Sequence, residues 1–462
     1  MEDVDVKETF TERPYPSCYR TGWFPAPHSE SWLQFHETII EKIKCHDKAL
    51  DPTVQDLLDF LTGDPVVAQL MATACRQNTA LYELSKKGHK HKETDGVPIP
   101  FIEDAEFFAL MCDVLLTTWP HFINDDLVGL PFSAYTVGID PTLAGSQLLG
   151  LPQFNEKMKP VLDKWHTFLG TRASAGGFAV EGEQWLSEKA KKSYKFDLWK
   201  KDNETLPYWN SWNSFFTREF KEPEKERPIA APDTNQVVNC PNDGSLFRWD
   251  WDVGADNPYW FKDMQYSIRD ILSSDDPAQQ AVIDQHNLVD IFQGGYVFQT
   301  YLNPYNFHRW WVPANGEVLF DPISIPGAYF NKLVLPDYGG ATTASLPYLT
   351  EVNARGLIVI DTGEYGRICC IPLGMSEVST ISFDKDMKKG AKVKKGQEMG
   401  MFNYGGSSFV MIFENLLDKE LVFINDKGKR YPQQPATATN SAGTGGEVTE
   451  IGAQIGVWYK RK

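Results

Sequence analysis

Two glycines followed by two serines occupy positions 405 to 408 of this chain. Glycine lets a backbone adopt conformations that other residues avoid, and it lets another group approach closely. The hydroxyl of Ser407 can therefore turn back on the carbonyl of Gly406 and convert the amide between them to an ester. β-Elimination then leaves a pyruvoyl group at position 407, which is a carbonyl cofactor made from the chain itself. The competing interpretation of these residues is an ordinary turn between two strands.

The charge of the chain limits its partners. The formal net charge is −17, from 62 acidic and 45 basic side chains. This excess argues against a nucleic-acid-binding protein, which needs a basic surface, and against adsorption to anionic lipid. No apolar run approaches the roughly 20 residues of a membrane span, so we expect no membrane anchor. The first ten residues resemble neither a signal peptide nor a transit peptide, which predicts a cytoplasmic location.

Cysteine and histidine usage predicts neither a disulfide framework nor a metal site. Seven cysteines in 462 residues are few for a disulfide scaffold, and no C-x-x-C pair is present. His89 and His91 form a His-x-His pair, which can ligate a metal, but no third ligand is near them in the sequence. We therefore predict that this pair belongs to a solvated loop.

The N-terminal half has the pattern of a helical domain. Four prolines predict an irregular segment over residues 1–30, and the helical domain is expected to span 31–195. Asp51-Pro52 and Asp64-Pro65 each place a capping aspartate before a first-turn proline. Apolar spacing of three and four residues indicates helices starting at Ser31 and over Asp104–Thr117, Pro141–Leu149, Gln153–Leu169 and Glu181–Lys192.

Residues 196–462 change to short β-type runs separated by Gly, Pro and Asn, so the predicted fold class is α+β. Either a barrel or a sandwich fits this pattern. The predicted strands are Glu317–Phe320, Gly356–Asp361, Arg367–Pro372, Ser379–Phe383 and Val448–Trp458, with a hairpin over Gly390–Gly400 and a flexible loop over Gln433–Gly446.

Four separated segments of the β-rich half agree with one family. They are Ser211–Phe220 with Glu226–Ile229, Val238–Ser245, Tyr305–Val318 with Ile325–Asn331, and Gly396–Ser408. In this order and spacing, over about residues 207 to 425, the chain resembles the phosphatidylserine decarboxylase family. The helical half, about residues 20 to 190, resembles the extra domain of a soluble branch that includes L-tryptophan decarboxylases of secondary metabolism.

The resemblance implies a pyruvoyl-dependent decarboxylase that is made as a zymogen and cleaves itself between Gly406 and Ser407. The carbonyl at position 407 would condense with the substrate amine to a Schiff base and accept the electron pair released with CO2. This is the role that PLP plays elsewhere, so no PLP is expected. The implied substrate is a free L-amino acid, aromatic by resemblance to the soluble branch. Phosphatidylserine is the alternative substrate.

Two further residues match positions with a role in the family. Asp243 matches the acid of the self-cleavage triad, although an aspartate before glycine is also common in turns. His308 matches the first histidine of a His-x-x-His pair, the one implicated in decarboxylation, although a lone histidine is often structural.

Position 311 departs from the family. The second histidine of the pair, which assists the self-cleaving serine as a base, is Trp311 here, and indole cannot accept a proton from a hydroxyl. This departure supports a rival function, that of a non-cleaving relative which binds a small amine or a partner protein. The aromatic residues Trp311, Tyr404 and Phe409 are candidates for a substrate pocket, and core packing is the alternative role for them. The sequence leaves the oligomeric state open.

Overall fold

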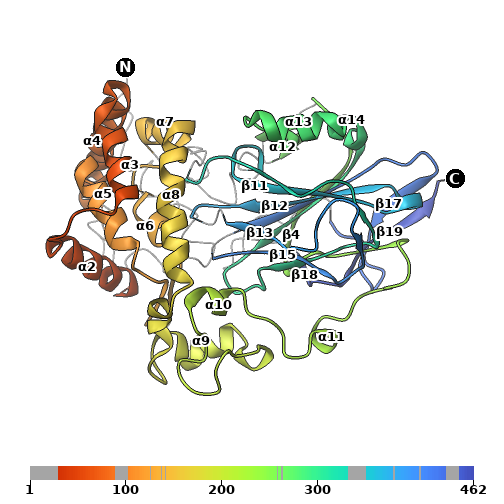
Figure 1. Cartoon of the computed structure of the whole chain (residues 1–462), viewed down its shortest axis with the longest axis horizontal. Helices are drawn as coiled ribbons and strands as arrows, with labels where there is room; N and C mark the ends of the chain where they lie inside the picture. Colours follow the sequence, from red (N-terminus) through yellow and green to blue (C-terminus); the bar gives the residue numbers. More distant parts are fainter. Residues whose placement is uncertain are drawn as a thin grey trace. The chain divides into compact units, whose positions relative to one another are not determined.

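The computed structural model describes residues 30–88, 102–124, 126–136, 138–140, 142–256, 259–261, 264–330, 350–377, 380–404, 407–432 and 447–461. They fall into two compact units (Figure 1). The first unit draws its described residues from 1–191, 203–212 and 328–346, and the second from 192–202, 213–327 and 347–462. The predicted irregular segment, the His89–His91 pair and the predicted loop at 433–446 lie outside the described residues, the first of them except for Glu30.

The N-terminal part of the chain is helical, as predicted. Its elements are α2 (Glu30–Lys44), α3 (Pro52–Gly63), α4 (Pro65–Gly88), α5 (Ala105–Leu115), β1 (His121–Ile123), β2 (Asp126–Val128), α6 (Pro131–Thr136), α7 (Leu143–Gly150), α8 (Pro152–Leu169), η2 (Arg172–Phe178), η3 (Gln184–Leu186), α9 (Glu188–Ser193) and η4 (Phe196–Leu198). None of the described helices is both long enough and apolar enough to cross a membrane.

The predicted helix caps are confirmed. Asp51 accepts a hydrogen bond from the backbone N–H of Thr53 at 3.0 Å, and Asp64 accepts one from Val66 at 2.8 Å. Each bond satisfies a backbone donor that the first turn of a helix leaves without an intrahelical partner. Helix α3 then buries its apolar residues against α4, α5 and α8, which form the core of the first unit.

Two helix predictions are corrected by the structure. Helix α7 begins at Leu143, two residues later than predicted, because the hydroxyl of Thr142 caps it by accepting from the Gly145 N–H at 2.9 Å. A continuous helix over Glu181–Lys192 is wrong. Gly182 (φ 83°) and Gln184 (φ 43°) adopt left-handed backbone conformations that interrupt a right-handed helix, so the segment forms η3 and α9 instead.

The remaining elements are mostly strands, which confirms the α+β class. They are α10 (Trp212–Phe216), α11 (Pro223–Glu226), β3 (Val237–Asn239), β4 (Gly244–Val253), β5 (Tyr259–Phe261), β6 (Met264–Tyr266), α12 (Ile268–Leu272), α13 (Pro277–Gln285), α14 (Leu288–Phe292), β7 (Gly295–Leu302), β8 (Arg309–Trp311), β9 (Gly316–Val318), β10 (Ile323–Ile325), β11 (Arg355–Asp361), η5 (Gly363–Tyr365), β12 (Arg367–Gly374), β13 (Ile381–Phe383), β14 (Lys392–Val393), β15 (Glu398–Phe402), β16 (Ser407–Phe413), β17 (Lys419–Phe423), β18 (Val448–Thr449) and β19 (Gln454–Lys460).

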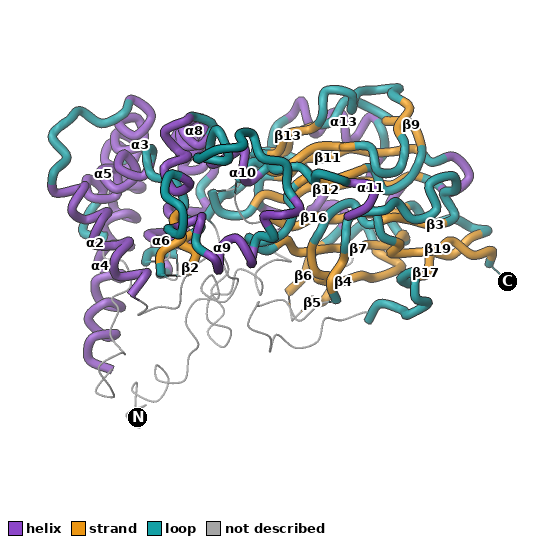
Figure 2. The backbone as a smooth tube through the Cα atoms, turned by 90° about the horizontal axis from the view of Figure 1, so that it is seen from below, coloured by secondary structure: helices purple, strands orange, loops and turns teal. Residues whose placement is uncertain are grey.

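A nine-stranded antiparallel sheet forms the centre of the second unit. Its strand order is β14-β9-β11-β12-β16-β7-β4-β18, with β10 paired to β11. Figure 2 shows β11, β12, β16 and β7 side by side. Every residue of β16 and of β7 is buried. Two three-stranded sheets, β13-β15-β8 and β17-β19-β3, complete the framework. Strand β16 is therefore a central strand that contacts β12 on one side and β7 on the other.

Two predictions for the β-rich half are wrong in how the strands pair, and three helices were not predicted. The predicted hairpin over 390–400 is not formed, because β14 pairs with β9 while β15 pairs with β8 and β13. The predicted last strand is divided into β18 and β19, which belong to different sheets. Helices α12–α14 were not predicted, although Asp276 before Pro277 is the same capping signal that identified α3.

A buried lysine joins the turn after β14 to the segment before β3. The Nζ atom of Lys395 donates to three carbonyl oxygens, those of Ala231 (2.9 Å), Thr234 (2.7 Å) and Val237 (2.6 Å). Burial lowers the pKa of Lys395 to about 8, whereas three carbonyl acceptors stabilise the ammonium form. The side chain is thus charged at neutral pH and holds two distant segments together.

We predict that Lys395→Met destabilises the second unit. The substitution removes three hydrogen bonds from a charged donor, a loss of about 3 kcal/mol. For a unit of this size the melting temperature should fall by roughly 6–12 °C, measured by thermal unfolding. Lys394→Met, at an exposed neighbouring position, is the control and should change the melting temperature little. Equal melting temperatures for the two variants would contradict this role.

Candidate active site

Ser407 is the first residue of β16, and it is completely buried. It is paired with Leu302 at the end of β7 on one side and with Gly374 at the end of β12 on the other. Its hydroxyl has no hydrogen-bond partner among the residues that the structure describes. Since a buried polar group is ordinarily bonded, this hydroxyl is exceptional and stands where the sequence places the nucleophile. Gly406 lies outside the described residues.

The neighbouring hydroxyl of Ser408 is fully engaged. Its Oγ atom donates to the carbonyl of Thr300 at 2.7 Å and accepts from Gln299 Nε2 at 3.0 Å. A serine hydroxyl has only one proton to donate. The structure therefore agrees with the sequence in the choice between the two adjacent serines, because of the two only Ser407 keeps a hydroxyl without a hydrogen bond.

His308 and Ser407 each follow a connection between the same two sheets. The chain leaves β7 at Leu302, opposite Ser407, and reaches His308 just before β8. The chain also leaves β15 at Phe402, whose N–H donates to the His308 carbonyl at 2.9 Å, and reaches Ser407. Both connections run between the same two sheets. The topology thus brings the predicted catalytic residues into one region of the second unit.

The imidazole of His308 is held neutral with a defined tautomer. Its Nδ1 atom lies 3.0 Å from the carbonyl oxygen of Asn306, which can only accept, so Nδ1 carries the proton and Nε2 carries the lone pair. Burial, and after it the charge of Arg218, lowers the pKa of His308 to about 3. Phe216 covers the ring at a centroid distance of 4.3 Å. The Nε2 atom of His308 is therefore unprotonated at physiological pH.

Arg218 is the buried cation beside His308, and sequence reasoning assigned it no role. Its Nη2 atom donates to the carbonyls of Tyr305 and Asn306, each at 3.2 Å, and its guanidinium lies 4.4 Å from the ring centroid of Trp199. The carbonyl of Asn306 therefore accepts from Arg218 and from His308 together. This arrangement fixes the turn that carries His308. The available signal was an arginine within the aromatic segment 211–220.

Asp243 lies in a buried turn beside position 311. Its two carboxylate oxygens accept from Arg227, at 2.9 Å from Nε and 2.7 Å from Nη2, and Oδ1 also accepts from the Ile451 N–H at 2.8 Å. The N–H of Trp311 donates to the Pro241 carbonyl at 2.8 Å, so position 311 is next to this turn. The charged partner of the Asp243 carboxylate is Arg227.

The predicted pocket residues lie in three different aromatic pairs. Trp311 contacts Phe307, Tyr404 contacts Phe216, and Phe409 contacts Trp310, with ring centroids 6.3, 4.9 and 5.9 Å apart. All three predicted residues are buried. Tyr404 shares Phe216 with His308, which places it beside the candidate site. A role for Trp311, Tyr404 and Phe409 in substrate binding stays a prediction.

Glu377 is a buried carboxylate near the site that the sequence analysis did not single out. It follows the end of β12 by three residues, and the last residue of β12, Gly374, is paired with Ser407. Burial raises the pKa of Tyr404 well above its usual value, and the charge of Glu377 adds to this effect. Ser376 beside it adopts a left-handed conformation (φ 58°), a strain that is often found near functional sites.

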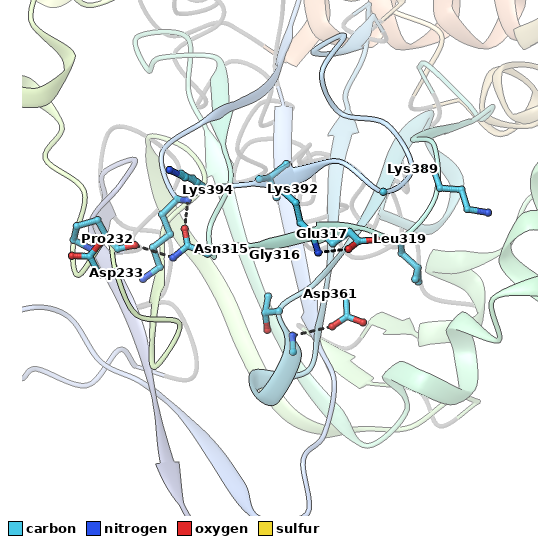
Figure 3. A pocket seen from close by; sticks show the side chains of 15 residues that line it. Pro232, Asp233, Asn315, Gly316, Glu317, Leu319, Asp361, Lys389, Lys392 and Lys394 are labelled. Carbon is cyan, nitrogen blue, oxygen red and sulfur yellow. Dashed lines mark hydrogen bonds and ion pairs between the residues drawn. The ribbon is translucent and has the colours of Figure 1, made fainter.

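A groove of about 1000 Å3 lies elsewhere in the second unit (Figure 3). It is lined by residues of β9, β14 and the turn that follows β11, and none of the predicted site residues lines it. Several of its polar groups bond to one another: Lys392 pairs with Glu317, and Asn315 Nδ2 donates to the Pro232 carbonyl at 2.9 Å. The groove therefore does not compete with the region around Ser407 as a catalytic site.

Comparisons with known proteins match most of the chain to one family. The family profile described as phosphatidylserine decarboxylase matches residues 212–431, and a second profile of the same description matches 51–194. Decarboxylase iboD of Amanita muscaria is 34% identical over 310 residues, which are 62% of this chain and 84% of that protein.

Two further relatives are named for different substrates. L-tryptophan decarboxylase of Psilocybe cyanescens is 25% identical over 430 residues, covering 86% of this chain and 89% of the relative. Phosphatidylserine decarboxylase proenzyme 2 of Oryza sativa is 28% identical over 209 residues, covering 45% of this chain and 30% of the relative. By these matches the chain belongs to the phosphatidylserine decarboxylase family and is a carboxy-lyase.

Proposed function

We propose that this chain is a pyruvoyl-dependent decarboxylase that releases CO2 from a free L-amino acid with an aromatic side chain. The observation that carries the proposal is the buried, unbonded hydroxyl of Ser407 at the start of a central strand. It fits a pyruvoyl precursor because no hydrogen bond within the described residues holds this hydroxyl away from the carbonyl that precedes it in the chain. The relatives named as L-tryptophan decarboxylases support a free amino acid as the substrate.

The cofactor would form from the chain alone. The Oγ atom of Ser407 attacks the carbonyl carbon of Gly406, the C–N bond breaks, and the nitrogen takes up the hydroxyl proton to give an ester with a free amine. Removal of the Cα proton expels the Gly406 carboxylate from Cβ. Water then replaces the nitrogen at Cα and ammonia leaves, so a ketone remains at position 407. No external oxidant or reductant is needed.

When present, the pyruvoyl group supplies an electrophilic carbonyl that can take up the electron pair released with CO2. The chain supplies proton transfer and exclusion of water. Neutral His308 can accept or return a proton at Nε2, since Nδ1 is committed to Asn306. Arg218 keeps this imidazole in place through the same carbonyl. Asp243, which is paired with Arg227, is our candidate for the family's acid that supports self-cleavage, and it could act through a water molecule.

Trp311 supports a second candidate function. Without the family's second histidine the chain would remain uncleaved and act as a binding protein for a small amine or a partner. Phosphatidylserine as substrate is the other alternative, in line with the relatives named for it. The experiments below separate these cases.

We predict self-cleavage between Gly406 and Ser407. Purified protein should contain a C-terminal fragment of residues 407–462 with a mass of about 6 kDa, at the mean residue mass of the chain. Intact-mass analysis reads both the fragment and the loss of ammonia. Ser407→Ala is the control and should give a single full-length chain. A full-length mass with an unmodified serine in the wild type would reject the proposed function.

We predict decarboxylation of tryptophan or another free aromatic amino acid without added PLP. Released CO2 is the measurement, and hydroxylamine should block the reaction by capturing the ketone. His308→Ala should lower the rate by about 10²–10⁴-fold, because it removes the basic nitrogen beside the site. Activity on phosphatidylserine vesicles but on no free amino acid would reverse the assignment of substrate.

We predict that Trp311→His accelerates self-cleavage, by up to about 10²-fold, because it restores a base next to the Asp243 turn. Trp311→Phe is the matched control, since it also reduces the volume of a buried aromatic residue but supplies no base. A time course of band splitting in freshly translated protein compares both with the parent. If the parent matures within minutes and Trp311→His changes nothing, loss of the base does not limit maturation.

A further inference from the structure

We propose that Gln299 and Ser408 are positioning residues for self-cleavage, which hold the peptide between residues 407 and 408 so that the Ser407 hydroxyl faces its own preceding carbonyl. This inference rests on the proposed function. Neither residue donates or accepts a proton in the chemistry. They act through Ser407, and they lie on β7 and β16, the two strands whose pairing places Ser407.

The hydrogen bonds around Ser408 form a continuous buried chain. Gln299 Nε2 donates to Ser408 Oγ at 3.0 Å and to Thr350 Oγ1 at 3.1 Å, and Ser408 Oγ donates to the Thr300 carbonyl at 2.7 Å. The relative exposure of each of these four residues is 1% or less. Four buried polar residues, from β16, β7 and position 350, are thus joined by hydrogen bonds directly after Ser407 in the sequence of β16.

The orientation of the Gln299 amide follows from counting protons. Ser408 has one hydroxyl proton, and at 2.7 Å it goes to the Thr300 carbonyl, which can only accept. Ser408 must then accept from Gln299, so the nitrogen of the amide faces Ser408. The oxygen Oε1 of Gln299 is left buried without a partner among the described residues. Leaving an acceptor unsatisfied costs about 1–3 kcal/mol, which indicates that the Ser408 contact is favoured over a fully satisfied arrangement.

Ser407 depends on this anchor because its own side chain has none. Its hydroxyl is unbonded, so side-chain hydrogen bonds fix the start of β16 only from Ser408 onward. Intramolecular attack is sensitive to geometry, and a displacement of about 1 Å can cost 10²-fold in rate. Side chains of adjacent strand residues point to opposite faces, so bonds on Ser408 set the direction of Ser407 without occupying its reaction space.

The arrangement also serves the cleaved protein. Conversion of residue 407 removes its N–H, its hydroxyl and its covalent link to Gly406. Ser408 then becomes the first residue of the fragment with a side-chain bond to β7. The carbonyl of the peptide between 407 and 408 is conjugated with the new ketone, so the hold on Ser408 also fixes the plane of that group.

The test is the rate of self-cleavage in freshly translated full-length chain, which requires no knowledge of the substrate. Ser408→Ala removes the anchor, and Gln299→Met keeps the length of the side chain but cannot donate. Each should slow cleavage at least tenfold, and the double variant should be no slower than the slower single variant, because both substitutions remove the same bond between Gln299 and Ser408. Ser408→Thr keeps the hydroxyl and should cleave at close to the wild-type rate.

Two controls separate positioning from stability. Thr362→Val removes another buried hydroxyl of the same unit, which donates to the Gly366 carbonyl at 2.6 Å, and should leave cleavage unchanged. Melting temperatures of Ser408→Ala and Thr362→Val, each combined with Ser407→Ala to prevent cleavage, should be lowered to a similar extent. A folding defect would instead appear as a much larger loss for Ser408→Ala.

The outcomes distinguish this inference from the proposed function. If wild-type protein stays uncleaved, the proposed function fails and this inference fails with it. If the wild type cleaves and either Ser408→Ala or Gln299→Met cleaves at the same rate, the positioning role is overturned while the proposed function stands. A fall in rate that follows the fall in melting temperature across all variants, Thr362→Val included, also overturns it.

Discussion

The pairing of β16 between β7 and β12 is the constraint on which the rest of the second unit depends. A central strand is buried on both faces, so its backbone bonds must go to its neighbours and its side chains must be apolar or bonded. The sequence of β16 satisfies this requirement from Phe409 to Phe413. It departs from it at the first two residues, which are serines. The fold therefore has to accommodate two hydroxyls in a place where water cannot bond them.

The two serines meet this constraint in opposite ways. Ser408 is satisfied by Thr300 and Gln299, so its burial costs little. Ser407 is not satisfied, and an unbonded buried hydroxyl costs about 1–3 kcal/mol. That cost is tolerated because flanking strands determine the position of the residue. This energetic asymmetry is a second reason to propose the chemistry at Ser407, beside its position directly after Gly406.

Much of the framework could be predicted from local signals, and the choice of partners could not. Asp51 and Asp64 identified their helices because a cap and its helix are adjacent in the chain. The glycine-rich run over 390–400 was predicted as a hairpin, because alternation and turns indicate strands without saying which strand pairs with which. Its two strands entered different sheets.

In the candidate site, too, local features could be predicted from the sequence and distant partners could not. The Gly-Gly-Ser-Ser run was visible in the sequence because the reacting atoms are adjacent. The bond from Gln299 to Ser408 spans 109 positions, and the bidentate pair of Arg227 and Asp243 spans 16 positions across an irregular segment. No local pattern identifies such partners. Arg218 was overlooked for a related reason, since an arginine among aromatic residues suggests a surface position until its burial is known.

The replacement of a histidine by Trp311 changes how charge is distributed around the site. The backbone of Trp311 keeps its bond to Pro241, so the strand and the Asp243 turn remain in contact. What is lost is a side chain that could pass a proton between the carboxylate and a hydroxyl. Asp243 instead forms a bidentate ion pair with Arg227, which is the charged partner of its carboxylate in this structure. His308, to which our proposal assigns proton transfer, is buried, neutral and bonded to the carbonyl that Arg218 also holds. We propose that the acid and the base of the family's arrangement are two separate structures in this chain, one of them the pair of Asp243 and Arg227 and the other His308.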